Sequence, residues 1–91
     1  MIGGTFYILQ SKETNKFYIG STKDLEKRLQ DHARGNTKTT RIHKPWILVY
    51  TENFETHTEA RKREYQIKKW KNHTRIQALI DRSAGRAVPT L

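Results

Sequence analysis

Residues 5–22 read TFYILQSKETNKFYIGST, and this stretch decides how the chain begins to fold. Residues 5–9 and 17–19 combine aromatic and β-branched side chains, which favour extended strands. The polar residues 11–15 between them are typical of a turn. Because the two apolar segments are close in the sequence, we predict that they pair as a β-hairpin whose second strand is closed by Gly20.

The length of the turn indicates a register for this hairpin. If Gln10 pairs with Asn15, residues 11–14 form a four-residue loop, which is a common length. Tyr7 then lies opposite Tyr18 on the same face of the sheet, with the two side chains about 5 Å apart at their base. The two tyrosines are either ordinary strand aromatics or a pair of phenols that orients or deprotonates a water molecule.

A helix is predicted directly after the hairpin. Ser21 and Thr22 can cap its start, and Asp24 then lies in its first turn, where the helix dipole favours an acid. The sequence RGN at residues 34–36 is expected to end the helix. Its apolar stripe recurs at a spacing of four residues, at Leu25, Leu29 and Ala33.

The second half of the chain predicts one more strand and two more helices. Residues 46–50 (WILVY) form an unbroken apolar run, which is typical of a buried strand. Thr56 or Thr58 is expected to cap a helix that reaches about Lys71. A shorter helix follows, with apolar positions at Ile76, Leu79 and Ile80.

Composition and charge exclude several classes of protein. The chain has 91 residues and a formal net charge of +9, which makes polyanions the first partners to consider. A single domain over residues 1–82, followed by a flexible tail at 83–91, is too small for a large interior cofactor pocket. The absence of cysteine excludes disulfides and thiolate metal sites, and the four histidines lack zinc-ligand spacing. With no visible signal peptide and no apolar run of the ~20 residues that a membrane span needs, we expect a cytoplasmic protein.

Two residues of the first predicted helix are candidates for phosphate chemistry. Arg28 and His32 lie four residues apart, so they share a helix face beside the apolar stripe. The arginine either binds a phosphate bidentately at the rim of a groove, or covers the core with its stem while its head stays hydrated. A lone histidine such as His32 is usually structural.

The candidate acid of the second predicted helix is Glu64. Ala60 and Ile67 flank it on one face, and most of its other helical neighbours are basic. The carboxylate either pairs with Lys68 at i+4 or ligates Mg²⁺, which proteins hold with one or two carboxylates together with substrate phosphates. The basic neighbours form either a solvated helix face or a nucleic-acid contact, and the chain-wide positive charge favours the second.

Taken in order, these segments resemble the GIY-YIG nuclease superfamily, and in particular its small stand-alone members, over about residues 5–80. The second tyrosine motif, residues 18–20 (YIG), is intact. At the first motif, residues 5–7 (TFY) stand where the family has Gly-Ile-Tyr, so the tyrosine is kept and the glycine is not. The other matching residues are those of 24–29 (DLEKRL) and 46–50, with His32, Gly35, Glu59, Ala60, Glu64, Ile67, Lys68 and Trp70.

The resemblance implies a fold and an activity. The fold is α/β of the α+β type, with a small three-stranded antiparallel sheet flanked by helices in the order β-β-α-β-α-α. The activity is endonucleolytic hydrolysis of DNA phosphodiesters, of the kind used in DNA repair or recombination, with a single Mg²⁺ or Mn²⁺ ion. The implied roles are Tyr7 as general base for the attacking water, Tyr18 assisting it, Arg28 stabilising phosphate charge, His32 beside the scissile phosphate, and Glu64 as metal ligand. Asn72 is the only nearby counterpart of a late asparagine that many members carry.

Partners and alternatives follow from the charge distribution. We expect double-stranded or branched DNA as the partner, and composition does not exclude RNA. The expected contacts are Lys23, Lys27, Arg34, Lys38, Arg41, Lys44 and Lys68. The alternative is a basic nucleic-acid-binding module that is non-catalytic or needs a partner for catalysis. A third interpretation, a basic protein–protein adaptor, would not need the tyrosine pair or Glu64.

Overall fold

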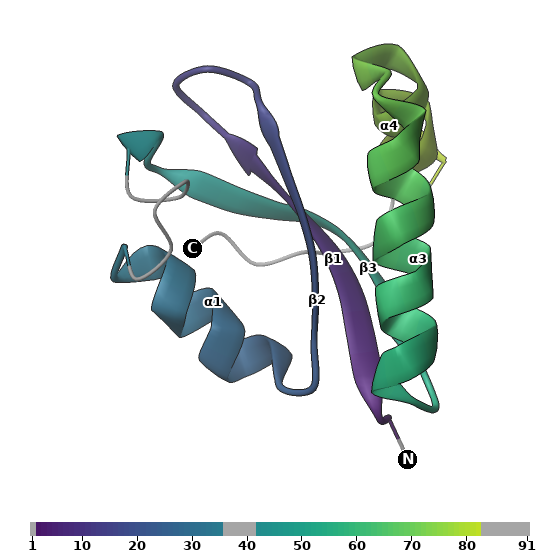
Figure 1. Ribbon diagram of the computed structural model, residues 1–91. Coiled ribbons are helices and arrows are strands. Elements are labelled where there is room, and N and C mark those ends of the chain that lie inside the picture. The colour runs from purple at the N-terminus through teal and green to yellow at the C-terminus, as the bar shows by residue number, and fades with distance from the viewer. Residues whose placement is uncertain (1, 36–41, 83–91) are drawn as a thin grey trace.

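The structure is a computed structural model that describes residues 2–35 and 42–82. Its elements are β1 (Gly4–Ser11), β2 (Phe17–Thr22), α1 (Leu25–Ala33), β3 (Trp46–Phe54), α3 (His57–Trp70) and α4 (His73–Asp81). This order, with one three-stranded antiparallel sheet, confirms the predicted α+β fold (Figure 1). The predicted tail at 83–91 and the predicted DNA contacts Lys38 and Arg41 lie outside the described residues.

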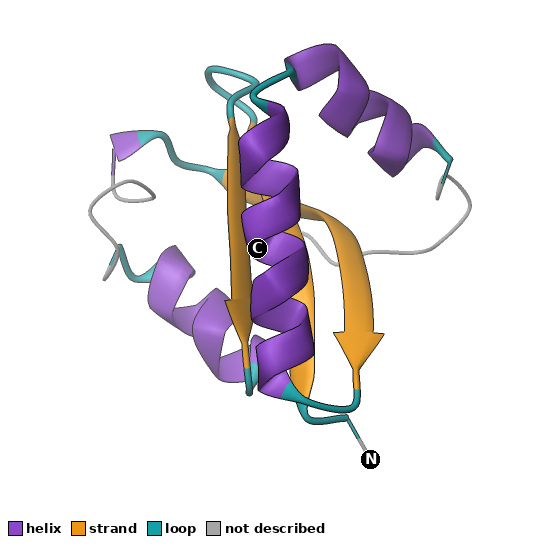
Figure 2. Cartoon of the chain, turned by 45° about the vertical axis from the view of Figure 1, so that its right-hand side comes forward, coloured by secondary structure: helices purple, strands orange, loops and turns teal. Residues whose placement is uncertain are grey.

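The sheet has the strand order β2-β1-β3, so β1 is central and is covered on both faces. Side chains alternate along it as the strand period requires. Phe6 and Ile8 pack with residues of α3 and α4 on one face, whereas Tyr7 and Leu9 pack with α1 on the other. Figure 2 shows α3 lying along its face of the sheet, with α1 on the opposite side. The edge strand β2 therefore runs between α1 and α3.

The predicted hairpin register is wrong by two residues. Tyr7 pairs with Gly20, and Tyr18 pairs with Leu9. A shift of one residue would have moved one tyrosine to the opposite face, but a shift of two keeps both on the α1 face. The two phenols are therefore diagonal neighbours, with ring centroids 6.4 Å apart and ring planes 23° from parallel.

Turn chemistry explains this register. Ser11, predicted to lie in the loop, is instead the buried last residue of β1. Its Oγ accepts hydrogen bonds from the backbone N–H groups of Glu13 and Thr14, both at 3.1 Å, and donates one to the His43 carbonyl at 2.7 Å. Asn15 closes the turn with φ 62°, a left-handed conformation that asparagine tolerates. The four-residue loop is thus 12–15 rather than 11–14.

Strand β3 contains a β-bulge. Ile8 pairs with Tyr50, while the next residue, Leu9, pairs with Leu48, so Val49 is the extra residue. Without the bulge, strict alternation would place Leu48 and Tyr50 on the same face. With it, Leu48 packs in the α1 core and Tyr50 in the α3 core. This accounts for the unbroken apolar run at the start of β3.

The helix caps agree with the sequence in α3 and differ in α1. Thr56 caps α3 by accepting from the Glu59 N–H, and Lys71 ends the helix, both as predicted. The predicted caps of α1 are wrong, because Ser21 and Thr22 are the last residues of β2, and Asp24 caps the helix by accepting from the Lys27 N–H. Within the described ranges, no helix combines the length and apolarity required to cross a bilayer.

Candidate functional site

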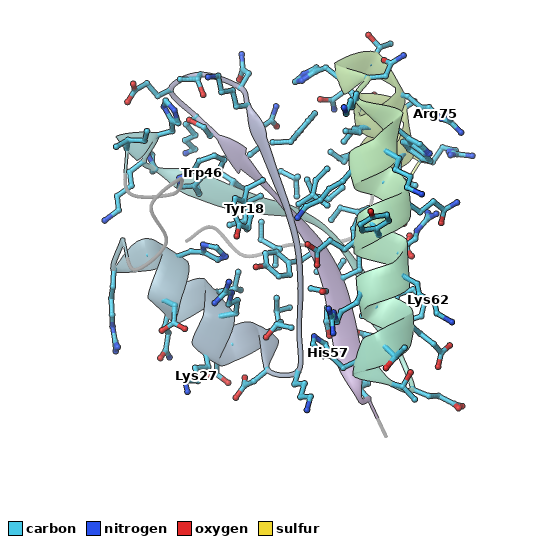
Figure 3. The ribbon with its side chains drawn as sticks, viewed as in Figure 1. Tyr18, Lys27, Trp46, His57, Lys62 and Arg75 are labelled. Carbon is cyan, nitrogen blue, oxygen red and sulfur yellow. The ribbon has the colours of Figure 1, made fainter. Side chains whose placement is uncertain are left out.

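A groove of about 220 Å³ crosses the edge strand β2 between α1 and α3. It brings together residues from both faces of the sheet, and Figure 3 shows two of them, Tyr18 and His57, on either side of β2. The lining residues are Tyr7, Tyr18, Gly20, Ser21, Arg28, His57, Arg61 and Glu64. Four of the five predicted catalytic residues thus line one groove, and the fifth, His32, lies directly behind Tyr7.

On the α1 side of the groove, the hydroxyl of Tyr7 contacts both His32 and Arg28. Its Oη lies 2.8 Å from Nε2 of His32, and Nε of Arg28 donates to it at 3.4 Å. Arg28 and His32 reach the same oxygen because they are one helical turn apart on α1. The ring of Tyr18 stacks beside Tyr7 and contacts the His32 imidazole edge-on, at 4.7 Å between centroids. The phenol pair and the Arg–His pair therefore form one cluster.

Burial sets the protonation states of this cluster. It raises the pKa of Tyr7 to about 12, because desolvation outweighs the opposing effect of the Arg28 hydrogen bond. Burial also lowers the pKa of His32 to about 4, and the positive charge of Arg28 acts in the same direction. At neutral pH, Tyr7 is therefore a neutral phenol and His32 a neutral imidazole. Tyr7 Oη and His32 Nε2 share a hydrogen bond, in which the phenol donates when the imidazole proton is on Nδ1.

The low pKa of His32 makes a prediction about stability. Below pH 6.5 the unfolded chain protonates His32, but the folded protein does so only near pH 4, so stability falls as the pH drops through this window. The expected loss in the free energy of unfolding between pH 7 and pH 4 is about 3 kcal/mol. Urea unfolding at pH 7 and pH 4 is expected to show this extra loss in the wild type but not in His32→Gln, where the titrating ring is absent. An equal loss in both proteins would exclude His32 as its source.

Gly20 is required by the position of the Tyr7 ring. The two residues are paired across β1 and β2, and the hydroxyl end of the Tyr7 ring lies against the glycine. A Cβ at position 20 would lie 2.5 Å from Oη and 2.6 Å from Cζ of Tyr7, closer than real Cβ contacts come. The absence of a side chain at Gly20 therefore allows Tyr7 to reach the groove.

The departure from the family pattern at Thr5 does not disturb the start of β1. Thr5 is buried, and its Oγ1 donates to Oδ1 of Asn53 on β3 at 3.0 Å. The close backbone approaches in this region occur at the two preceding residues: a Cβ at Gly3 would lie 2.0 Å from the Glu55 carbonyl oxygen, and a Cβ at Gly4 would lie 2.6 Å from Cα of His57. Gly4 therefore permits the contact with the start of α3, and position 5 is free to carry a side chain.

Glu64 supplies the only carboxylate among the described residues that line the groove. Ser21 Oγ donates to its Oε1, and Lys68 Nζ lies 2.6 Å from its Oε2. The side chain is about one-quarter exposed, so it is fixed by these contacts yet open to the groove. The sequence left two interpretations open, an ion pair with Lys68 and a metal ligand. The ion pair is present, and it leaves Glu64 facing the groove.

The residues present fit a divalent cation held mainly by substrate and water. Among the described residues, no group of three His, Asp or Glu side chains is placed to hold a metal. Glu64 offers a hard oxygen ligand of the kind Mg²⁺ prefers. Its Oε2 is paired with the ammonium group of Lys68, which a cation bound at this oxygen would displace. The other ligands would then be phosphate oxygens and water, as is common for Mg²⁺.

Four lining residues were not predicted as part of the site, namely Gly20, Ser21, His57 and Arg61. The sequence indicates Gly20 only as the end of a strand and part of the YIG motif, and Ser21 only as a helix cap. It indicates His57 only as one of four histidines without zinc-ligand spacing, and Arg61 only as one of a cluster of surface bases. The sequence contains a pattern that indicates His57 and Arg61. Positions 57, 61, 64 and 68 follow at steps of four, three and four, so both residues share a helix face with Glu64. For Ser21 no signal exists in the sequence, because its partner Glu64 is 43 residues away.

None of the other described residues that the sequence predicted for the site or for DNA contact lines the groove. Asn72 is not part of it, because its Oδ1 caps α4 by accepting from the Arg75 N–H at 3.0 Å. Lys68 forms the ion pair with Glu64, and about half of its side chain is exposed to solvent. The other described residues predicted to contact DNA are exposed around α1 and at the approach to β3, namely Lys23, Lys27, Arg34 and Lys44.

Comparisons with known proteins cover nearly the whole chain. A profile of the GIY-YIG catalytic domain matches residues 3–77. A UPF0213 protein of Staphylococcus saprophyticus is 40% identical over 76 residues, which are 82% of this chain and 92% of that protein. A UPF0213 protein of Staphylococcus aureus is 36% identical over 77 residues, which are 84% of this chain and 93% of that protein. The solution NMR structure of a UPF0213 protein from Bacillus halodurans matches 90% of this chain and 86% of that chain, with a TM-score of 0.58 and 32% identity.

Proposed function

This chain belongs to the GIY-YIG catalytic domain family, and we propose that it is an endonuclease that hydrolyses DNA phosphodiester bonds with the help of one divalent cation, Mg²⁺ or Mn²⁺. The observation that carries the proposal is the convergence on one groove of a phenol, a guanidinium and a carboxylate. Tyr7 and Arg28 reach the groove from the α1 face, and Glu64 reaches it from α3. Arg28 and Glu64 are charged and only partly buried, and Tyr7, whose ring packs in the α1-face core, directs its hydroxyl to Arg28 and His32.

Glu64 would hold the cation, with Ser21 orienting its carboxylate through the hydrogen bond to Oε1. When bound, the cation polarises the scissile phosphate. Arg28 is half-buried at the opposite wall of the groove, and its pKa is raised by the hydrogen bond to Tyr7, so it stays charged. Its guanidinium offsets the negative charge that develops on the phosphate oxygens.

Tyr7 would accept the proton of the attacking water. Its raised pKa means that it carries a proton at neutral pH, so it can accept another only by passing its own to His32. The water oxygen forms the new bond to phosphorus, the water proton moves to Oη of Tyr7, and the Tyr7 proton moves to Nε2 of His32. One ester P–O bond breaks, and solvent protonates the leaving oxygen. His32, whose pKa is about 4, then releases the transferred proton to solvent. Tyr18, stacked beside Tyr7, helps to position the water.

The proposal is tested by a nicking assay on labelled duplex, single-stranded and branched DNA in Mg²⁺, Mn²⁺ or EDTA. The expected result is cleavage of at least one substrate with either metal and none in EDTA. The variant Glu64→Gln is assayed in parallel, and loss of cleavage in this variant would show that the cleavage takes place in this groove. Salt-sensitive binding without cleavage under any of these conditions would overturn the proposal in favour of a non-catalytic or partner-dependent binding module.

Arg28→Ala is expected to lower kcat by ~10²–10³-fold, the usual effect of removing one donor to a developing oxyanion. DNA affinity is expected to change by less than about threefold, because one phosphate contact among many is lost. The matched control is Gln30→Ala, an exposed residue of α1 outside both the groove and the predicted DNA contacts, which should leave kcat and affinity unchanged. Steady-state cleavage and equilibrium binding in EDTA separate the two effects. Equal losses in both measurements would make Arg28 a simple phosphate anchor.

A further inference from the structure

The outer face of α3 carries an exposed aromatic side chain that the fold does not use. Tyr65 is 67% exposed, although it lies on a helix whose apolar positions, Ala60 and Ile67, are completely buried. Its four nearest helical neighbours, at i−4, i−3, i+3 and i+4, are all basic: Arg61, Lys62, Lys68 and Lys69. Figure 3 shows one of them, Lys62, on the side of α3 that faces away from the sheet. An aromatic ring at the centre of four positive charges is thus presented to solvent.

This surface is continuous with the groove. A hollow of about 500 Å³ lies along it, and the described residues that line it all belong to α3: Thr58, Arg61, Lys62, Glu64, Tyr65 and Lys68. Arg61 and Glu64 line both the hollow and the groove. We call Arg61, Lys62, Tyr65, Lys68 and Lys69 the α3 track. A strand whose phosphate sits at Glu64 therefore meets the α3 track next.

We propose that the α3 track binds a single-stranded DNA segment adjoining the groove, with Tyr65 stacking on an unpaired base. The inference rests on the proposed function, because it takes the groove to hold the scissile phosphate. The four basic side chains can contact phosphates, but such contacts do not distinguish paired from unpaired DNA. Tyr65 can distinguish paired from unpaired DNA, since a ring on the convex face of a helix can stack only on a base that is not already stacked inside a duplex.

The contact already present at the ring fits this role. Lys69 Nζ lies over the Tyr65 ring, 4.7 Å from its centroid. A cation on one face of a phenol holds the ring in place and brings positive charge beside it. A base stacked on the ring would therefore have its own phosphate close to an ammonium group. The combination of a stacking ring with a basic surface is the means by which proteins bind single strands without reading their sequence.

The test is equilibrium binding by fluorescence anisotropy in EDTA, where no metal-dependent cleavage occurs. The probes are a labelled single-stranded oligodeoxynucleotide, the same strand in a blunt duplex, and a duplex with a single-stranded extension. Tyr65→Ala is expected to weaken binding to both probes with unpaired bases by ~10–100-fold, the usual effect of losing one base–aromatic stack. Binding to the blunt duplex is expected to change by less than about twofold.

Three further variants make the result specific. Tyr65→Phe keeps the ring and is expected to bind as the wild type, whereas Tyr65→Leu keeps apolar bulk and is expected to behave as Tyr65→Ala. Lys62→Ala is expected to weaken binding to all three probes alike and to reduce the salt dependence by about one phosphate contact. Equal losses on duplex and single strand for Tyr65→Ala, no loss at all, or normal binding by Tyr65→Leu would each overturn the inference.

The outcome is separable from that of the nicking assay. Because binding is measured without a metal, Tyr65 can be shown to select unpaired DNA whether or not the protein cuts it. If the wild type cuts duplex DNA and Tyr65→Ala leaves every affinity unchanged, the proposed function holds and this inference fails. If no substrate is cut but Tyr65 selects single strands, the proposed function fails and the α3 track is a binding surface in its own right.

Discussion

Glu64→Gln is expected to lower metal-dependent cleavage by ~10³-fold or more. The physical reason is that a bound cation contributes several kcal/mol of charge stabilisation, and each 1.36 kcal/mol is a factor of ten in rate. Among the described residues that line the groove, Glu64 is the only carboxylate, so no neighbour can replace it. The amide keeps the size of the side chain and can still accept from Ser21, so the fold is expected to persist. The ion pair with Lys68 is largely exposed and contributes little to stability.

The measurement pairs single-turnover cleavage with a direct titration of Mn²⁺ binding. Glu64→Gln is expected to lose both, with an unchanged far-UV circular dichroism spectrum. Glu13→Gln, which removes an exposed carboxylate from the hairpin loop, is the matched control and should retain both. Turnover at the wild-type level in Glu64→Gln would remove the carboxylate from the metal site. Lost turnover with undiminished Mn²⁺ binding would mean that the cation is held elsewhere.

Gly20→Ala is expected to damage both stability and activity, although it adds a single methyl group. The new Cβ would overlap the Tyr7 ring, with Oη at 2.5 Å and Cζ at 2.6 Å. Tyr7 is completely buried, with Tyr18 and His32 packed against its ring, so it cannot move away without disturbing them. Overpacking of this kind costs about 1–3 kcal/mol of unfolding free energy. A displacement of Tyr7 by about 1 Å is expected to lower cleavage by ~10²-fold.

A double-mutant cycle identifies the contact responsible. Tyr7→Leu alone removes the ring and is expected to destabilise the protein, because it leaves a cavity over Gly20. In the double variant Gly20→Ala/Tyr7→Leu, the added methyl group no longer meets the ring, so the combined loss should be smaller than the sum of the single losses. Urea unfolding of the four proteins measures the difference. Strict additivity would show that Gly20 is needed for some other reason than the position of Tyr7.

The sequence alone predicted the order and type of the elements, a helix cap at Thr56 or Thr58, and that the two tyrosines share one face of the sheet. These features are local, since strand pairing, helix periodicity and capping depend on residues that are close along the chain. It also indicated Arg28 and His32 as partners, because a spacing of four places two side chains on one helix face. It did not predict that both meet the oxygen of Tyr7, which comes from a different element.

Only the tertiary structure decided the rest of the site. The register depended on Ser11, whose place at the end of β1 is secured by a hydrogen bond to the His43 carbonyl, 32 residues away. Glu64 joined the groove because α3 packs beside the edge strand, bringing it to Ser21 across 43 residues. The pKa values of Tyr7 and His32 moved because packing removed water from both groups. Burial and long-range contact are properties of the folded chain, and no local pattern of residues encodes them.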